Sequence, residues 1–246
     1  MDSEFNLNDH TARLLMDEPF FASISRRIDK RASFAVPTAG VMVNPDNGQF
    51  EMLYNPDFFA KLTDAERRDV LKHEYYHIVF LHVTDRMPEG VNPRLWNVAT
   101  DLAINSHLHH LPAGGLIPGE PGSKFEHLPR GESAEWYMAN MPDFQKEGGG
   151  SGEGKQGQGE SSEQQSSGGS PDQGEQNSDN QSGDGVPDSL DDHSGWGNCS
   201  QEVKDMAKER LKDIIKKAAE DCAKNNSWGT VHSRVQKKIM KVLETK

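Results

Sequence analysis

The stretch TDAERRDVLKHEYYHIVFLH, residues 63–82, holds the strongest structural signals of the chain. It opens with a capping box, in which Thr63 is the expected N-cap and Glu66 returns a hydrogen bond to the cap. Neither glycine nor proline interrupts the residues that follow, up to His82. The stretch therefore predicts a helix that starts after Thr63 and continues to His82 or beyond.

Two histidines on this helix have the spacing of metal ligands. His73 and His77 are four positions apart, which rotates one side chain by only about 40° from the other, so both imidazoles project from one face. Glu74 lies about 100° around the helix from His73, where it can reach a metal-bound water but not join the ligands. Two imidazoles, one carboxylate and an open fourth position favour Zn²⁺, one per chain. Zinc would lower the pKa of that water towards ~7, and Glu74 could accept its proton.

The alternative is an accidental match, because the chain contains ten histidines. The surroundings of the motif argue against it, since a metal site of this kind requires an uninterrupted helix that faces a core. Apolar residues flank the motif on both sides, namely Val70, Leu71, Ile78, Val79 and Leu81.

A second helix is predicted from Pro93 to about His109, and it offers the third ligand. Asn97, Asp101 and Asn105 follow one another at intervals of four positions and form a polar stripe on an otherwise apolar helix. A buried carboxylate is costly unless it is paired or coordinates a metal, so Asp101 is the predicted ligand, with the two asparagines as its hydrogen-bond partners. In the alternative, Asp101 makes ordinary hydrogen bonds and the ligand is His109, His110, Glu126 or Glu135.

Other polar residues receive weaker assignments. His82 lies five positions past His77, would point about 140° away from it on a continuous helix, and is excluded as a ligand. A transition-state oxyanion needs a hydrogen-bond donor, and Tyr137 is the candidate catalytic residue for this role. The other candidate donors are Tyr75, Tyr76 and His127.

The rest of the first 146 residues predicts a mixed architecture in which helices predominate. Residues 7–31 are expected to form one or two helices interrupted at Pro19, and residues 133–141 one more. Phe34–Val43 and Gln49–Tyr54 are short β-prone runs on either side of a turn signal, which predicts a β-hairpin. The hairpin either caps the core or offers a strand edge to an extended substrate backbone.

The last hundred residues differ in composition. Residues 147–185 contain no hydrophobic residue, and their eight acidic residues against Lys155 carry a net −7 of the chain's −12. Such a segment cannot bury enough apolar surface to offset its ordering entropy, so residues 147–198 are predicted to be a disordered acidic linker. Residues 199–246 are expected to form two amphipathic helices that pack on the domain of residues 1–146.

The composition also argues against some classes of protein. A net charge of −12 gives no electrostatic support for nucleic-acid binding. No window has the ~18–20 apolar residues of a membrane span, and no signal peptide is recognisable. Two cysteines without metal-knuckle spacing suit a reducing compartment. We therefore expect a cytoplasmic protein without a membrane partner.

Four motifs follow one another along the chain: Asn55-Pro56, His73-Glu74-x-x-His77, the run WNVATDLAIN at 96–105, and Glu135-x-Tyr137. In this order they resemble the metallopeptidase domain that precedes von Willebrand A-like domains in bacterial and phage proteins. The resemblance covers roughly residues 13–141. It implies that His73, His77 and Asp101 bind the metal and that Glu74 is the catalytic carboxylate. The family typically continues into a von Willebrand A-like domain, whereas this sequence ends at Lys246.

These features predict an α+β, zincin-like fold, helix-rich with a small β-hairpin, followed by the linker and the C-terminal helices. The expected function is zinc-dependent hydrolysis of peptide bonds in protein or peptide substrates, with Glu74 as general base. One alternative is a non-catalytic, zinc-stabilised module that engages a protein partner through the linker or the C-terminal helices. Another is a zinc hydrolase of a non-peptide amide or ester.

Overall fold

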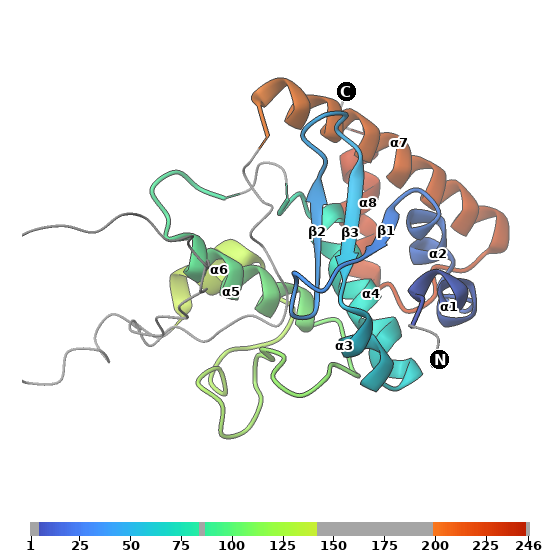
Figure 1. The fold of residues 1–246 in the computed structure, drawn as a ribbon. Coiled ribbons are helices and arrows are strands. Elements are labelled where there is room, and N and C mark those ends of the chain that lie inside the picture. Colours follow the sequence, from blue (N-terminus) through green and yellow to red (C-terminus); the bar gives the residue numbers. More distant parts are fainter. Residues whose placement is uncertain (1–4, 84–86, 142–198, 245–246) are drawn as a thin grey trace, which may run out of the picture. The chain divides into compact units, whose positions relative to one another are not determined.

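The computed structural model describes residues 5–83, 87–141 and 199–244, and the predicted linker at 147–198 lies outside them. Helices surround a small mixed sheet in the described residues (Figure 1), which confirms the α+β class. In chain order the elements are α1 Leu7–Leu14, α2 Pro19–Ser25, β1 Asp29–Ala32, β2 Ala39–Val43, β3 Phe50–Tyr54, α3 Pro56–Lys61, α4 Asp64–Val79, α5 Pro93–Asn105, α6 Ala134–Asn140, α7 Gln201–Asn225 and α8 Ser233–Glu244.

The predicted hairpin is confirmed as β2 and β3. The two strands pair antiparallel from Ala39 opposite Tyr54 to Val43 opposite Phe50. In the turn between them Gly48 has φ +66°, a left-handed conformation that glycine adopts without a steric penalty. The strand order is β1-β3-β2, with β1 parallel to β3, so β2 forms one edge of the sheet.

Two predictions for the N-terminal region were wrong. Helix was expected as far as Arg31, but α2 ends at Ser25 and the following residues form β1. This strand is stabilised by pairing with β3, a partner about twenty residues away that local sequence does not reveal. The first predicted β-run is also shorter than expected, because residues 33–38 form a loop in which Phe34 is 63% exposed.

Helices α3 and α4 both begin at residues whose side chains cap the helix N-terminus. The side chain of Asn55 accepts hydrogen bonds from the backbone N–H groups of Asp57 and Phe58 and begins α3, a short helix that was not predicted. The capping box of α4 is confirmed, with Thr63 and Glu66 bonded reciprocally. This helix ends at Val79 and not at His82, and Leu81 then takes φ +65°.

Helix α4 lies at the centre of the described fold. Every residue from Asp69 to Val79 is buried. The helix contacts strand β2 and the helices α1, α2, α5 and α7. Polar residues between Asp69 and Val79 are therefore removed from water whichever way they point, and each needs a partner inside the protein.

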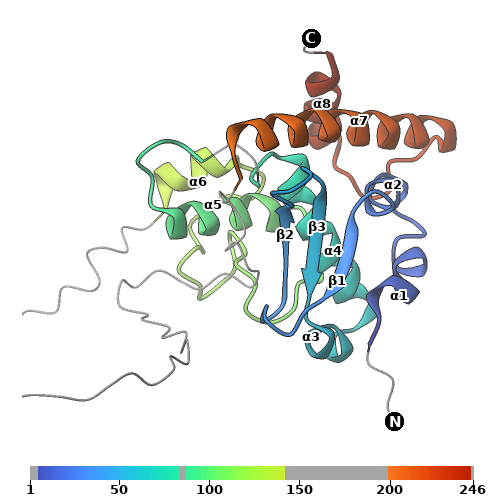
Figure 2. The ribbon, with the colours of Figure 1, turned by 45° about the horizontal axis from the view of Figure 1, so that its top comes forward.

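The C-terminal helix α7 packs along α2 (Figure 2). Its predicted apolar stripe, which includes Leu211 and Cys222, belongs to the same hydrophobic core as Phe20. Asp221 accepts hydrogen bonds from Ser23 and Arg26 of the α2 region. None of the helices in the described ranges combines the length and the apolar character needed to cross a bilayer.

Candidate metal centre

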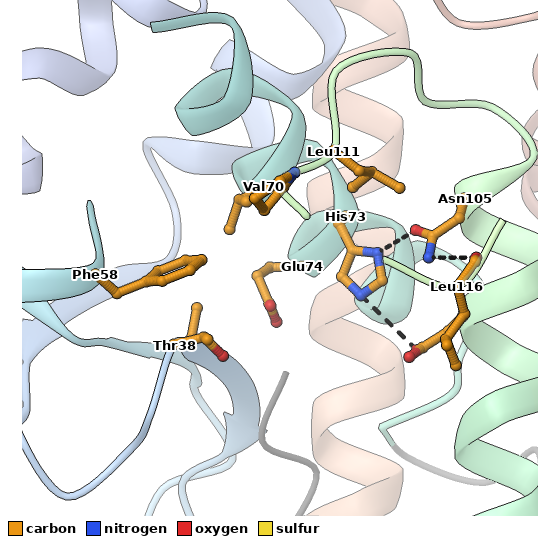
Figure 3. A pocket seen from close by; sticks show the side chains of 11 residues that line it. Thr38, Phe58, Val70, His73, Glu74, Asn105, Leu111 and Leu116 are labelled. Atoms are coloured by element: carbon orange, nitrogen blue, oxygen red, sulfur yellow. Dashed lines mark hydrogen bonds and ion pairs between the residues drawn. The ribbon is translucent and has the colours of Figure 1, made fainter. Parts of the chain in front are cut away.

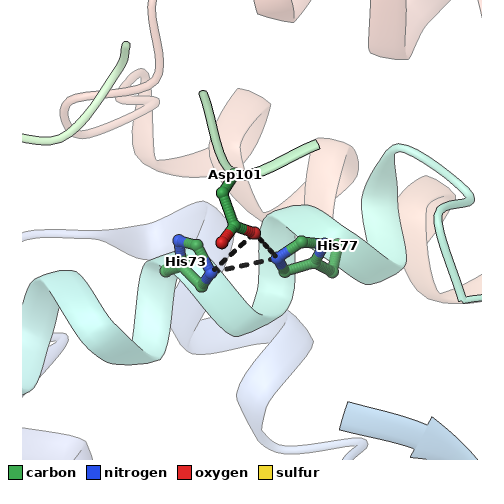
Figure 4. A group of neighbouring side chains, drawn as sticks. All are labelled: His73, His77 and Asp101. Atoms are coloured by element: carbon green, nitrogen blue, oxygen red, sulfur yellow. Dashed lines mark hydrogen bonds and ion pairs between the residues drawn. The ribbon is translucent and has the colours of Figure 1, made fainter. Parts of the chain in front are cut away.

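Three side chains proposed from the sequence as ligands converge in the core (Figure 4). His73 and His77 project from one face of α4, and Asp101 reaches them from α5. The Nε2 atoms of the two histidines are 3.0 Å apart. Oδ1 of Asp101 lies 3.4 Å from Nε2 of His77 and 3.8 Å from Nε2 of His73. All three side chains are buried.

The spacing of these atoms fits one zinc ion. Tetrahedral zinc with Zn–N distances of about 2.0–2.1 Å holds two ligand atoms about 3.3 Å apart. The observed separations of 3.0, 3.4 and 3.8 Å lie on both sides of that value. Two imidazoles and one carboxylate are also a donor set of catalytic zinc sites, in which a fourth position takes water or substrate.

A hydrogen-bond chain orients the His73 ring. Asn105 donates from Nδ2 to the carbonyl oxygen of Leu116 over 2.9 Å, so its Oδ1 faces Nδ1 of His73, at 2.7 Å (Figure 3). Because an amide oxygen can only accept, Nδ1 carries the proton, and in the neutral ring Nε2 is then the unprotonated nitrogen. This tautomer directs a metal-binding atom at the cluster. The sequence suggested Asp101 as the partner of Asn105, and the bond goes instead to His73.

His82 contacts Nδ1 of His77, the ring nitrogen that does not face Asp101. The two Nδ1 atoms are 3.2 Å apart, so one of them donates to the other. The sequence argument placed His82 about 140° from His77 because it assumed a continuous helix. Helix α4 ends at Val79, and the turn through Leu81 brings His82 back against His77. When Nδ1 of His77 is the donor, its Nε2 is the unprotonated atom that faces Asp101.

Glu74 lies beside the cluster, as the motif predicted. Its side chain is buried, and it lines a pocket together with His73, Asp101 and Asn105 (Figure 3). The volume that the centre of a water molecule can occupy in this pocket is ≈ 20 Å³. A space of that size holds about one water molecule.

The candidate oxyanion donors lie in other surroundings. Tyr137 is fully buried on α6, and its hydroxyl donates to the carbonyl oxygen of Pro129 at 2.7 Å and contacts Ser106 at 2.9 Å. It does not line the pocket that contains Glu74. These contacts give Tyr137 a packing role, and its catalytic assignment stays a prediction that this geometry does not support. Among the alternatives, Tyr75 bonds to Ser25, Tyr76 packs between aromatic rings, and His127 is exposed.

The alternative third ligands are not part of the cluster. Their side chains are exposed, and the cluster of potential metal ligands found in the described residues contains only His73, His77 and Asp101. The alternatives were His109, His110, Glu126 and Glu135. The backbone N–H groups of the two histidines donate instead to the buried carboxylate of Asp69, at 2.9 and 2.8 Å.

A second buried polar cluster begins at the residue before His73. Lys72 donates to Glu18 at 3.1 Å and to the hydroxyl of Thr230 at 2.6 Å. Thr230 in turn donates to the same carboxylate from its hydroxyl, at 2.6 Å, and from its backbone N–H, at 2.9 Å. Lys72 and Glu18 are each at most 4% exposed. This cluster connects α4 to the α1–α2 junction and to the segment between α7 and α8.

One histidine outside the cluster has a strongly shifted pKa. Burial lowers the pKa of His107 to about 4, with further lowering by electrostatic interaction with His232, Lys238 and Arg234. Its ring lies 5.9 Å from that of Tyr76 and 6.5 Å from that of His232, centre to centre. The neutral form of His107 is therefore the one that the fold accommodates.

Comparison with known proteins identifies the family of the chain. No solved structure matches the chain. An uncharacterized protein of Thermotoga maritima is 32% identical over 69 residues, which are 28% of this chain and 17% of the relative. The aligned part thus spans less than a fifth of that protein. The family model with the description "Putative metallopeptidase domain" matches residues 3–245, and the chain belongs to this family.

Proposed function

We propose that the protein is a zinc-dependent peptidase in which His73, His77 and Asp101 hold the ion and Glu74 is the general base. The observation that carries this proposal is the buried convergence of three ligand atoms at separations of 3.0–3.8 Å. Glu74 lines the same pocket as two of these residues. Membership of the metallopeptidase family supports the same reaction class.

The chemistry follows from the groups in the pocket. Zinc held by the three residues would polarise the substrate carbonyl and lower the pKa of water to about 7. The Glu74 carboxylate takes the proton of the attacking water and can later deliver it to the leaving amine. Asn105 and His82 orient the imidazole rings of His73 and His77, respectively. Each contacts the Nδ1 atom of its ring, which leaves the Nε2 atom directed at Asp101.

A peptide substrate is favoured by the position of β2. This strand forms an edge of the sheet, and Ala39 at its start and the preceding Thr38 line the pocket that contains Glu74. An extended peptide entering beside Ala39 would lie next to Glu74 and His73, which line the same pocket. Its carbonyl groups would then pass close to the cluster.

The second candidate function is hydrolysis of a small non-peptide amide or ester. It is favoured by the limited room beside Glu74, ≈ 20 Å³ for the centre of a water molecule. Assays with a peptide library and with a panel of small esters and amides separate the two candidates. Turnover of peptides alone supports the first, and turnover confined to the small panel supports the second.

Glu74→Gln tests the proposed mechanism. The amide cannot accept the proton, so the hydrolytic rate should fall about 10²–10⁴-fold. Zinc content should be unchanged, because Glu74 is not among the proposed ligands. Glu135→Gln, an exposed glutamate on α6, is the matched control and should keep the full rate. A Glu74→Gln protein that binds zinc and hydrolyses at the wild-type rate would refute the role of Glu74.

A further inference from the structure

The pocket beside Glu74 has two chemically different sides. His73, Asp101 and Asn105 line its polar side, and mainly apolar residues line the other side, which we call the apolar pocket. In Figure 3, Phe58, Val70 and Thr38 lie on the opposite side of Glu74 from Asn105. We define the apolar pocket by its lining residues Thr38, Ala39, Phe58, Val70, Leu111 and Pro112.

The walls of the apolar pocket come from four segments. Ala39 is the first residue of β2 and Thr38 precedes it, Phe58 belongs to α3 and Val70 to α4, and Leu111 and Pro112 belong to the loop after α5. Val70 and Glu74 are four positions apart on α4, so they share one helix face. A group that fills the apolar pocket therefore lies next to the proposed general base.

The loop wall is held at both ends by buried polar side chains. Before the wall, the backbone N–H groups of His109 and His110 donate to Asp69. After the wall, the carbonyl oxygen of Leu116 accepts from Asn105. Asp69 and Asn105 are 3% and 2% exposed. Because both anchors are buried, the loop has little freedom to widen the pocket.

Size and polarity restrict what the apolar pocket can accept. The whole pocket, its polar side included, has a water-centre volume of ≈ 20 Å³, so its apolar side has room for at most about one methyl-sized group. A charged side chain would lose its hydration there and would find no counter-charge on these walls, whose one side-chain hydroxyl is that of Thr38. A Leu or Phe side chain would have to displace Phe58, Val70 or Leu111, and overpacking of this kind is unfavourable.

The geometry points to the apolar pocket as a specificity pocket for a small apolar side chain, such as that of alanine, next to the scissile bond. Phe58 and Val70 set its size. This inference rests on the proposed function, since it assigns the class of substrate that the same site takes. Substrates with a small apolar residue at one of the two positions beside the cleaved bond are therefore selected over those with large or charged residues.

Binding of hydroxamates to the zinc-loaded protein tests this inference without requiring turnover. Acetohydroxamate reports whether the metal has an open position, and N-acetylated hydroxamates of Ala, Leu, Phe and Asp report the preference of the pocket. Wild type should bind the Ala compound at least about tenfold more tightly than the Phe and Asp compounds. Val70→Ala should shift the Leu-to-Ala affinity ratio about tenfold towards Leu, as a pocket enlarged by methyl groups does.

Two further variants make the test decisive. Val79→Ala is the matched control, because Val79 lies on the same helix, is similarly buried at 5% against 7% for Val70, and lines a different cavity beside α7. It should leave the order of affinities unchanged. Phe58→Leu enlarges the pocket from α3 and should repeat the shift if Val70→Ala does not fold.

The outcomes separate the two proposals. Acetohydroxamate that fails to bind zinc-loaded wild type would overturn the proposed function, because the metal would have no open position. Acetohydroxamate that binds, together with equal affinities for the four side chains, would overturn only the specificity pocket. A preference that neither Val70→Ala nor Phe58→Leu changes would overturn the roles of these two residues.

Discussion

Two buried polar clusters occupy neighbouring residues of α4 and differ in the kind of atoms they bring together. In the Lys72 cluster, ammonium, hydroxyl and backbone N–H donors meet the carboxylate of Glu18, so opposite partners satisfy one another. In the His73 cluster, two imidazole nitrogens and a carboxylate oxygen face one another. A proton on His77 would satisfy one of these contacts, whereas a single cation satisfies all three. Convergence of acceptors, more than burial of polar groups, therefore distinguishes the candidate site from a structural ion pair.

The largest expected effect comes from breaking the structural cluster. Lys72→Met removes the ammonium and leaves the Glu18 carboxylate buried, which should lower the free energy of unfolding by about 3–5 kcal/mol. Chemical denaturation measures this change. The double variant Lys72→Met with Glu18→Gln should recover only the part of the loss that comes from Glu18, because the buried Asp69 carboxylate, 3.7 Å from the Lys72 ammonium, also loses its counter-charge.

The zinc content of the Lys72→Met variant tests whether the two clusters are independent. Folded Lys72→Met should bind as much zinc as wild type, because Lys72 provides no ligand to the His73 cluster. Loss of zinc from protein that remains folded would mean that the two clusters act as one site.

A smaller effect is expected from the group that orients His73. Asn105→Leu removes the acceptor for Nδ1 of His73 and should weaken zinc binding about 10–100-fold, the usual effect of losing such an outer partner. Competition with a fluorescent chelator measures the affinity. Asn97→Leu, on the same helix, serves as control and should have little effect. An equal loss in both variants would favour the sequence-based view that the whole asparagine stripe supports Asp101.

The smallest effect concerns pH and the contact of His107, just after α5, with His232 of the C-terminal region. Because the pKa of His107 falls to about 4 in the fold, the unfolded chain binds more protons between about pH 6.5 and 4. Its contribution to stability is therefore complete above pH 6.5 and is lost as the pH falls towards 4. One pKa unit corresponds to about 1.4 kcal/mol, so the full fall in pKa would be worth about 3.5 kcal/mol. Solvent screening of this half-buried ring should reduce the effect to about 1–2 kcal/mol.

The variant His107→Phe isolates this contribution. Unfolding measured from pH 7 to 4 on metal-free protein should show a shallower loss of stability in the variant than in wild type. Parallel curves would contradict the assignment, since His73, His77 and the other titrating groups are common to both proteins.

Much of α4 and of the metal cluster could be predicted from the sequence, because the signals are local. The capping box at Thr63 and the spacing of His73 and His77 need only helical geometry, and Asp101 follows from a polar stripe on an apolar helix. The ligand roles themselves stay proposals. In the structure these three side chains meet.

The features that sequence reasoning missed depend on tertiary contacts. Strand β1 forms because β3 pairs with it, and Lys72 is buried because Glu18 and Thr230 meet it from distant parts of the chain. His82 contacts His77 because α4 ends three residues earlier than its composition suggests. The cap at Asn55 followed by Pro56 was a readable helix start, although it was interpreted only as the end of the hairpin.

The most direct test of the central claim is the zinc content of purified protein, measured by elemental analysis after zinc supplementation and dialysis. Wild type and the control His110→Ala, which removes an exposed histidine outside the cluster, should each carry one zinc per chain. His73→Ala and Asp101→Ala should carry none while remaining folded by circular dichroism. Wild-type protein without zinc, or Asp101→Ala protein with a full equivalent, would contradict the three-ligand centre.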